Sequence, residues 1–186
     1  MNKKFRFVVP FILVLMVLGL TLPACQKPAT ETPPAPPEQG TAGALTFEAA
    51  EYVNAEYGFS VKYPKDWVQQ QNTPGIVFLA SAAKRVPVFS VAIQDGATFT
   101  DALAANLAMQ GSDINIATPS STTLADGTPA FETETKWKAQ GLGANTFSLG
   151  VQKDSKWIIV SVTTVSLLAK YDKAQFSEIV HTLTFK

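Results

Sequence analysis

The chain is poor in the side chains that form cross-links and metal sites, since its 186 residues include one cysteine and one histidine. One cysteine excludes an intramolecular disulfide and a cysteine-rich metal site, and one histidine excludes a zinc site built on paired histidines. Charged residues make up 16% of the chain, below the roughly 25% usual for soluble domains. The 15 Lys and Arg balance the 15 Asp and Glu, and a net charge of zero argues against a nucleic-acid binder, which normally carries a basic excess.

The chain also lacks an apolar run long enough to span a bilayer at its N-terminus. Residues 7–20 carry no charge and follow the basic residues Lys3, Lys4 and Arg6. A membrane span needs about 20 apolar residues, whereas a short basic region, a brief apolar region and a small residue define a secretory signal peptide. We therefore predict a signal peptide over residues 1–24.

The four residues that follow the apolar run, Leu22-Pro23-Ala24-Cys25, resemble the bacterial lipobox. The resemblance implies cleavage before Cys25 and attachment of a diacylglyceryl group, with fatty acids such as palmitate, to its sulfur. Pro23 departs from the small or β-branched residue usual at its position. The alternatives are a secreted protein with a free thiol and an uncleaved anchor. Two or three acyl chains hold a protein stably to a bilayer, so we expect a lipoprotein of the cell membrane or outer membrane that faces outside the cytoplasm.

A proline-rich linker separates this anchor from the rest of the chain. Residues 25–45 include five prolines among small and polar residues, which predicts a disordered segment. Twenty such residues reach about 60 Å at ~3.1 Å per residue. Residues 46–186 then form one domain with 11 basic and 13 acidic residues, long enough to stand without disulfides.

Hydrophobic periodicity divides this domain into strands and two helices. Alternation and hairpin turns favour a mainly antiparallel sheet, whose faces the helices can cover. Thr98 is expected to cap the first helix, with Asp101 near its positive end, and Gly111 to end it in the left-handed conformation. The expected helices are 98–110 and 171–182, and the expected strands are 51–55, 59–63, 76–80, 88–93, 121–125, 130–140, 145–152 and 156–165.

Two segments carry a family resemblance. Residues 57–67, Tyr-Gly-Phe-Ser-Val-Lys-Tyr-Pro-Lys-Asp-Trp, are similar to the opening of the PsbP/Mog-like superfamily, and the spacing of Phe176, Ile179, Leu183 and Phe185 is similar to its closing helix and last strand. The resemblance implies an α+β fold in which a mainly antiparallel sheet of about six strands is covered by helices, an α/β/α sandwich. Members include an extrinsic photosystem II subunit, a Ran-binding eukaryotic protein and many bacterial lipoproteins, and most of their known roles are binding and assembly.

The residues of the opening motif have a structural interpretation. We expect Phe59, Val61 and Tyr63 to fill the core, because they alternate with polar residues. Pro64 should end the strand, since it lacks the amide donor, and Trp67 should fold back over the sheet. The alternative for Trp67 is a platform for a ligand. No metal-binding or partner-binding residue of the family matches this sequence.

Several residues could support catalysis. Ser81-x-x-Lys84 matches the Ser-x-x-Lys of penicillin-binding enzymes, but it lies in an expected turn and no Lys-Thr-Gly follows. His181 could act as a general base with Ser177 and Glu178 one helical turn back, and the alternative is a half-buried helical histidine. A Ser-His-Asp arrangement would need partners brought together by the fold.

Charged side chains also alternate along residues 130–140. Glu132 and Glu134 share a strand face, roughly 7 Å apart at ~3.3 Å per residue, which suits acid–base work or a hard cation. Lys136 and Lys138 on the same face favour a solvated charged face instead.

The remaining polar signals indicate turns. Asp66, Asp95 and Asp126 lie near Pro or Gly and are interpreted as turn residues. Gly141-x-Gly143 lacks the third glycine of a phosphate-binding loop.

The sequence therefore favours a membrane-anchored, non-enzymatic module that binds another envelope protein or helps assemble a complex, with no cofactor and no nucleic acid. The alternatives are a small-ligand or metal-binding envelope lipoprotein and an envelope hydrolase.

Overall fold

A computed structural model describes residues 44–186. The predicted signal peptide, the lipidation site at Cys25 and nearly all of the linker lie outside the described residues. Within the described part, no helix has the length and apolar character to cross a membrane.

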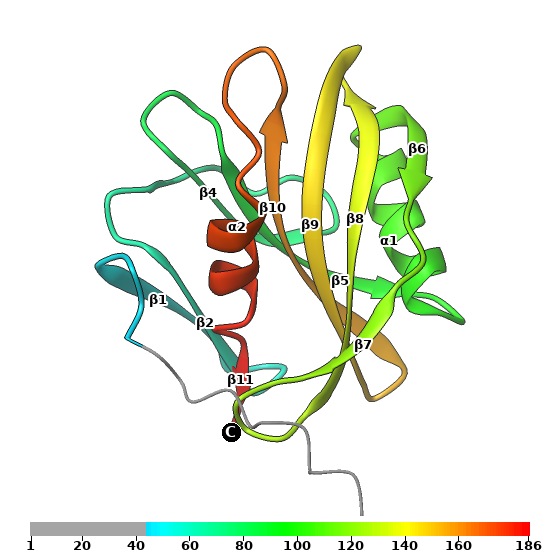
Figure 1. The fold of residues 1–186 in the computed structure, drawn as a ribbon. Coiled ribbons are helices and arrows are strands. Elements are labelled where there is room, and N and C mark those ends of the chain that lie inside the picture. Colours follow the sequence, from blue (N-terminus) through cyan, green and yellow to red (C-terminus); the bar gives the residue numbers. More distant parts are fainter. Residues whose placement is uncertain (1–43) are drawn as a thin grey trace, which may run out of the picture. The chain divides into compact units, whose positions relative to one another are not determined.

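The described chain forms two β-sheets and two helices, and every strand pairing is antiparallel. Figure 1 shows the arrangement. The small sheet has the order β1 (Ala49–Asn54), β2 (Phe59–Pro64), β11 (Thr184–Phe185). The large sheet has the order β3 (Val68–Gln69), β4 (Ile76–Ser81), β5 (Val88–Asp95), β10 (Lys156–Val165), β9 (Leu142–Lys153), β8 (Pro129–Ala139), β6 (Gly111–Ile116), and β7 (Ser120–Thr123) also pairs with β8.

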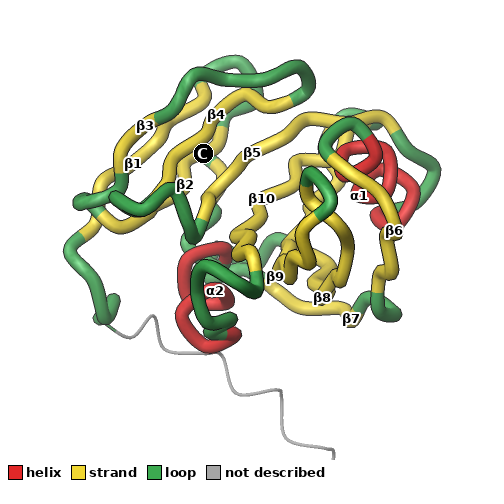
Figure 2. The backbone as a smooth tube through the Cα atoms, turned by 90° about the horizontal axis from the view of Figure 1, so that it is seen from above, coloured by secondary structure: helices red, strands yellow, loops and turns green. Residues whose placement is uncertain are grey.

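The large sheet is covered on both faces, which Figure 2 shows from above. The small sheet and helix α2 (Lys173–Val180) pack on one face, and helix α1 (Phe99–Ala108) packs on the other. β10 lies in the middle, so Ile158 and Val160 enter the first core while Ile159 enters the second. This explains why the apolar residues of β10 are consecutive rather than alternating.

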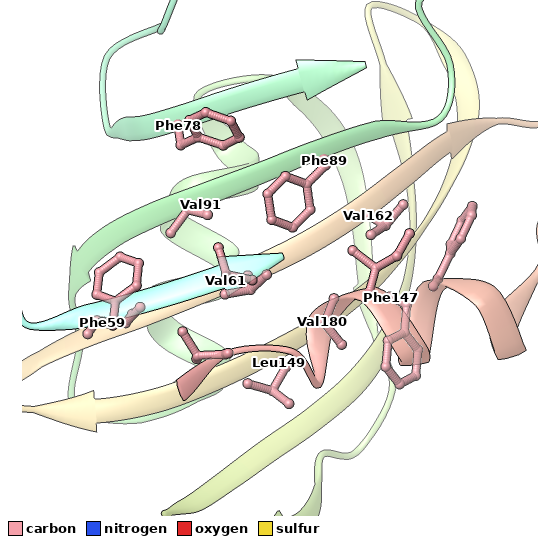
Figure 3. Packing of buried hydrophobic residues seen from close by; sticks show 14 of the residues in the cluster. Phe59, Val61, Phe78, Phe89, Val91, Phe147, Leu149, Val162 and Val180 are labelled. Carbon is pink, nitrogen blue, oxygen red and sulfur yellow. The ribbon is translucent and has the colours of Figure 1, made fainter. Parts of the chain in front are cut away.

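The core between the large sheet and the small sheet with α2 is dense in aromatic and branched residues (Figure 3). Phe59 and Val61 of β2 are buried there as the sequence predicts, and Trp67 is buried in the same cluster. Tyr63 is half-buried, and its ring stacks on that of Phe89 with 5.7 Å between centroids. The opening motif therefore packs the core, as expected.

The predicted start of α1 is also confirmed. The hydroxyl of Thr98 accepts a hydrogen bond from the amide of Asp101, whose carboxylate accepts one from the Thr98 amide. This reciprocal capping satisfies two amides that the first helical turn leaves free.

The expected fold of about six strands covered by helices is wrong, because the described residues form sheets of three and eight strands with only two helices. Part of one face of the large sheet is covered by the small sheet and not by a helix. The prediction missed β3, which has only two residues, and β6, whose pairing with β8 shifts register between Ser112 and Asn115.

Gly111 illustrates the error. It does not end α1, whose C-terminal cap is Met109 in the right-handed conformation. Gly111 instead begins β6, where a Cβ atom would lie 1.9 Å from the carbonyl oxygen of Lys138. Glycine is needed here for the close approach of two strands and not for a left-handed turn.

Candidate functional site

The charged face of β8, formed by Glu132, Glu134, Lys136 and Lys138, lies beside α2. The sequence predicts this face to be fully solvated, but both glutamates are half-buried and only the lysines are exposed. Register explains the placement, because Glu132 and Glu134 are paired with Leu149 and Phe147, which belong to the core under α2.

Glu134 is the centre of a hydrogen-bonded cluster with the start of α2. Its carboxylate accepts hydrogen bonds from the Lys173 ammonium (2.7 Å) and the Tyr171 hydroxyl (2.9 Å). The Lys173 hydrogen bond lowers the pKa of Glu134, and the Tyr171 hydroxyl and the charge of Lys136 add to this against the opposing effect of burial. Burial and the same carboxylate raise the pKa of Tyr171. Glu134 is therefore held as a carboxylate that joins α2 to the large sheet.

Glu132 forms a second cluster with the end of α2. Its carboxylate lies 3.2 Å from Nε2 of His181, and Nδ1 of His181 lies 3.2 Å from the Ser177 hydroxyl. A serine, a histidine and an acid therefore converge, with Glu132 in place of the Glu178 that sequence spacing suggests. Glu178 instead accepts hydrogen bonds from the amide and hydroxyl of Thr46.

The direction of the histidine hydrogen bonds decides what this cluster can do. Nδ1 of His181 also lies 2.8 Å from the carbonyl oxygen of Ser177. A carbonyl only accepts, so this contact requires a hydrogen on Nδ1, and in that tautomer Nδ1 has no lone pair to remove the proton of the Ser177 hydroxyl. The contacts of His181 with Ser177 and Glu132 fasten the last turn of α2 to β8.

A polar pocket of about 240 Å³ opens next to Glu134. Three side chains form a row across neighbouring strands, because Asn115 of β6 is paired with Lys136 of β8, and Lys136 with Asn145 of β9. Among the described residues Lys136 forms no ion pair, so its ammonium is available to a ligand. The lining residues are Asn115, Ala117, Glu134, Thr135, Lys136, Asn145, Thr146 and Tyr171.

Sequence reasoning did not find this pocket as a site. Asn115, Asn145 and Tyr171 are far apart in the chain and match no motif. The register of the strands would have shown that these residues are neighbours. That register could not be worked out, because the sequence analysis did not predict β6.

The other predicted candidates are not brought together. Ser81 is buried at the end of β4 and Lys84 is exposed in the following turn, with no hydrogen bond between their side chains in the described part of the chain. Asp95 pairs with Lys156 at 2.7 Å. Across residues 44–186, no three His, Cys, Asp or Glu side chains converge to hold a metal ion.

Asp66 and Asp126 lie in turns as predicted, whereas Asp95 is the last residue of β5 and is paired with Lys156 of β10. Gly141 has φ +83°, and Asp126 accepts a hydrogen bond from the amide of Thr128. Asp126 also accepts one from the amide of Phe185 at 2.8 Å. Burial opposes the charge of Asp126, but these hydrogen bonds outweigh it and lower its pKa. Asp126 thus joins the β7–β8 turn to the last strand of the small sheet.

Comparisons with known proteins identify the fold class. No protein-family profile matches the chain, and no curated protein shows significant sequence similarity. The solution structure of cyanobacterial PsbP (CyanoP) from Synechocystis is similar to this chain with a TM-score of 0.56 and 14% identity, covering 77% of this chain and 96% of that one. The chain therefore has a PsbP-like fold.

Two further solved structures match less well and support no argument. A protein from Bacteroides thetaiotaomicron has a TM-score of 0.47 at 17% identity, covering 73% of this chain and 48% of its own. A Pseudomonas aeruginosa protein of unknown function, described as a putative regulator, has a TM-score of 0.35 at 14% identity, covering 64% of this chain and 84% of its own.

Proposed function

We propose that this chain is a lipid-anchored extracytoplasmic protein whose PsbP-like domain binds another envelope protein or complex without catalysing a reaction. The lipobox-like sequence ending at Cys25 supports the anchor. The observation that carries the binding role is the pocket beside Glu134, in which Lys136 forms no ion pair with any residue of the described part of the chain.

The pocket suits part of a protein better than a free small molecule. Its volume of about 240 Å³ lies below the roughly 300–1,000 Å³ of most small-molecule sites. Lys136 and the amides of Asn115 and Asn145 can donate hydrogen bonds to a carboxylate or to backbone carbonyl groups. The side chain of an acidic residue, or the carboxylate at the C-terminus of a partner, has the size and charge to fill the pocket.

The neighbouring strand adds a second means of contact. β6 is the last strand in the order of the large sheet, so its outer backbone groups face away from β8. An exposed edge strand can pair with an extended segment of another protein. A partner that enters the pocket would lie directly against this edge, because Asn115 belongs to both.

The chemistry of the histidine supports a binding role over a hydrolytic one. His181 contacts the Ser177 carbonyl through Nδ1 and the Glu132 carboxylate through Nε2, so its contacts fix α2 in place. In the tautomer that donates to the Ser177 carbonyl, His181 cannot act as the base for a Ser177 nucleophile.

Site-specific photo-crosslinking in native membranes tests this proposal. Benzoylphenylalanine replaces the exposed Asn115 at the pocket rim, and in a matched control it replaces the exposed Glu51 on β1. We expect one protein to crosslink from position 115 and not from position 51. We expect the crosslink to disappear when Cys25→Ser releases the chain from the membrane and to weaken with Lys136→Gln. Equal crosslinking from both positions, or none from position 115, would contradict a partner at the pocket.

Binding of a small polar ligand in the same pocket is the second candidate function. A carboxylate or sugar that raises the melting temperature of the purified protein, with the increase lost in Lys136→Gln, would favour it. A panel of such ligands without effect would remove this candidate.

A further inference from the structure

Three connections meet at one end of the described domain. They are residues 82–87 between β4 and β5, residues 140–143 at the β8–β9 turn, and residues 166–171 between β10 and α2. We call them together the loop end. Figure 1 shows them at the top of the drawing, while the described chain begins at the lower left.

Strand pairing confirms that the three connections are neighbours. The amide of Ser166 donates to the carbonyl of Gly143 at 2.9 Å, which joins the second and third connections. Val88, which follows the first connection, is paired with Thr163 near the end of β10. The loop end is therefore one continuous surface made of segments distant in sequence.

Exposed leucines are concentrated on this surface. Leu167 is 81% exposed, Leu168 is 60% exposed and Leu142 is 43% exposed. Leu142 and Leu167 each adjoin one residue of the hydrogen-bonded pair that joins the two connections. Clustered exposed aliphatic side chains are unfavourable in water and mark surfaces that bind a protein or a membrane.

The charge of the loop end has one sign. Its charged residues are Lys84, Arg85 and Lys170, all exposed, and it has no acidic residue. None of the three forms an ion pair within residues 44–186. The remainder of residues 46–186 has 8 basic and 13 acidic residues. The loop end is thus a positive, leucine-rich region on an otherwise acidic domain.

We propose that the loop end docks on a bilayer whose surface carries anionic lipid headgroups. Leu167 and Leu168 enter the boundary between headgroups and acyl chains, and Lys84, Arg85 and Lys170 contact the phosphates. Apolar side chains flanked by Lys and Arg are the combination that places a protein at this boundary. The remainder of the domain has more acidic than basic residues and is repelled by the same headgroups, which favours an orientation with the loop end toward the bilayer.

The anchor keeps a bilayer within reach, and in this respect the inference rests on the proposed function. About 20 residues separate Cys25 from the domain, and they span at most about 70 Å. A domain of this length has a radius of gyration of about 15 Å. The chain is therefore long enough to let the domain turn and place its loop end on the membrane that holds the anchor.

A fluorescent label on the loop end tests the docking in the full chain. The protein carrying Ser166→Cys is labelled with the polarity-sensitive dye NBD and reconstituted into vesicles of phosphatidylcholine alone or with 30 mol% phosphatidylglycerol (about one lipid in three). The unsubstituted protein, taken through the same labelling, corrects for dye on Cys25. We expect a blue-shifted emission and quenching by nitroxide lipids in the vesicles with phosphatidylglycerol, and neither in phosphatidylcholine alone.

Paired variants identify the residues responsible. Leu167→Ser with Leu168→Ser should abolish the shift, whereas Val53→Ser, at an exposed valine of β1, should leave it unchanged. Lys84→Gln with Arg85→Gln should lower the ratio of docked to undocked protein by about thirtyfold. The matched pair Lys62→Gln with Lys65→Gln should not lower it. Unchanged melting temperatures show that each variant is folded.

The outcomes separate this inference from the proposed function. Co-flotation of the protein with the vesicles measures whether the chain is attached by its anchor. The emission of the dye measures whether the loop end enters the bilayer, and it does so even for a chain without an anchor that binds from solution. If the emission is not blue-shifted in vesicles with phosphatidylglycerol, the docking proposal is wrong. The loop end would then be expected to bind an acidic protein surface. A shift of equal size in phosphatidylcholine alone, or one that survives the leucine substitutions, also overturns it.

Discussion

Substituting Gly150 by alanine tests how α1 packs on the large sheet. A Cβ atom at Gly150 would lie 2.3 Å from Cδ2 and Cε2 of Phe99, the first residue of α1. Non-bonded carbon atoms prefer about 3.5–4.0 Å, so the ring has to retreat by more than an ångström. It has little room, because Phe99 is buried and its ring packs on Trp157 with 5.6 Å between centroids.

The expected loss of stability follows from two opposing effects. Forcing an extra carbon into a packed core costs about 1–3 kcal/mol, and replacing a strand glycine by alanine recovers about 0.5–1 kcal/mol. We expect Gly150→Ala to lower the free energy of unfolding by about 1–2 kcal/mol, measured by urea denaturation with tryptophan fluorescence.

Gly143→Ala is the matched control in the same strand, because its Cβ atom would meet only the Ser166 hydroxyl oxygen at 3.8 Å. It should be neutral or slightly stabilising. Phe99→Leu should relieve part of the Gly150→Ala defect in the double variant. Equal stability of the two alanine variants would refute the placement of Phe99 against β9.

The remaining predictions concern β6, α2 and the core. Gly111→Ala should destabilise by at least about 2 kcal/mol in the same denaturation assay, because its Cβ would overlap the Lys138 carbonyl; a neutral result would contradict the pairing of β6 with β8. Tyr171→Phe should raise the pKa of Glu134, observed by carbon NMR of the carboxyl group, since it removes a hydrogen bond that lowers this pKa; an unchanged pKa would exclude that bond. Folding lowers the pKa of Glu134, so the carboxylate adds to the free energy of unfolding above its unfolded pKa, and this contribution is lost as the pH falls through its folded pKa. Glu134→Gln should therefore reduce the loss of stability at acid pH by up to about 1 kcal/mol, because the site is partly exposed. Trp67→Ala should cost about 3–5 kcal/mol as a buried aromatic residue, and a cost below 1 kcal/mol would place its ring outside the core.

The core and the helix start were predictable because they depend on local patterns. Phe59 and Val61 alternate with their neighbours, and the strand that holds them is confirmed within one residue. Thr98 and Asp101 form their cap within four residues of sequence. The antiparallel pairing of β9 with β10 follows from the short turn between them.

The division into two sheets could not be predicted in this way. The last strand, β11, pairs with β2 from the opposite end of the domain, with Phe185 opposite Phe59. No local pattern reports a partner 126 positions away. The pocket could not be predicted for the same reason, because Asn115 and Asn145 become neighbours only through their pairing with Lys136 on β8.

The mass of the mature N-terminus is the measurement that tests the account most directly, because both proposals depend on a chain held at a membrane. The protein is extracted from membranes of cells that express it with its own leader, and its N-terminal peptide is analysed by mass spectrometry. We expect a peptide that begins at Cys25 and carries the mass of a diacylglyceryl group, and we expect Cys25→Ser to carry no such mass. A mature protein with unmodified Cys25, or one that keeps residues 1–24, would contradict the account.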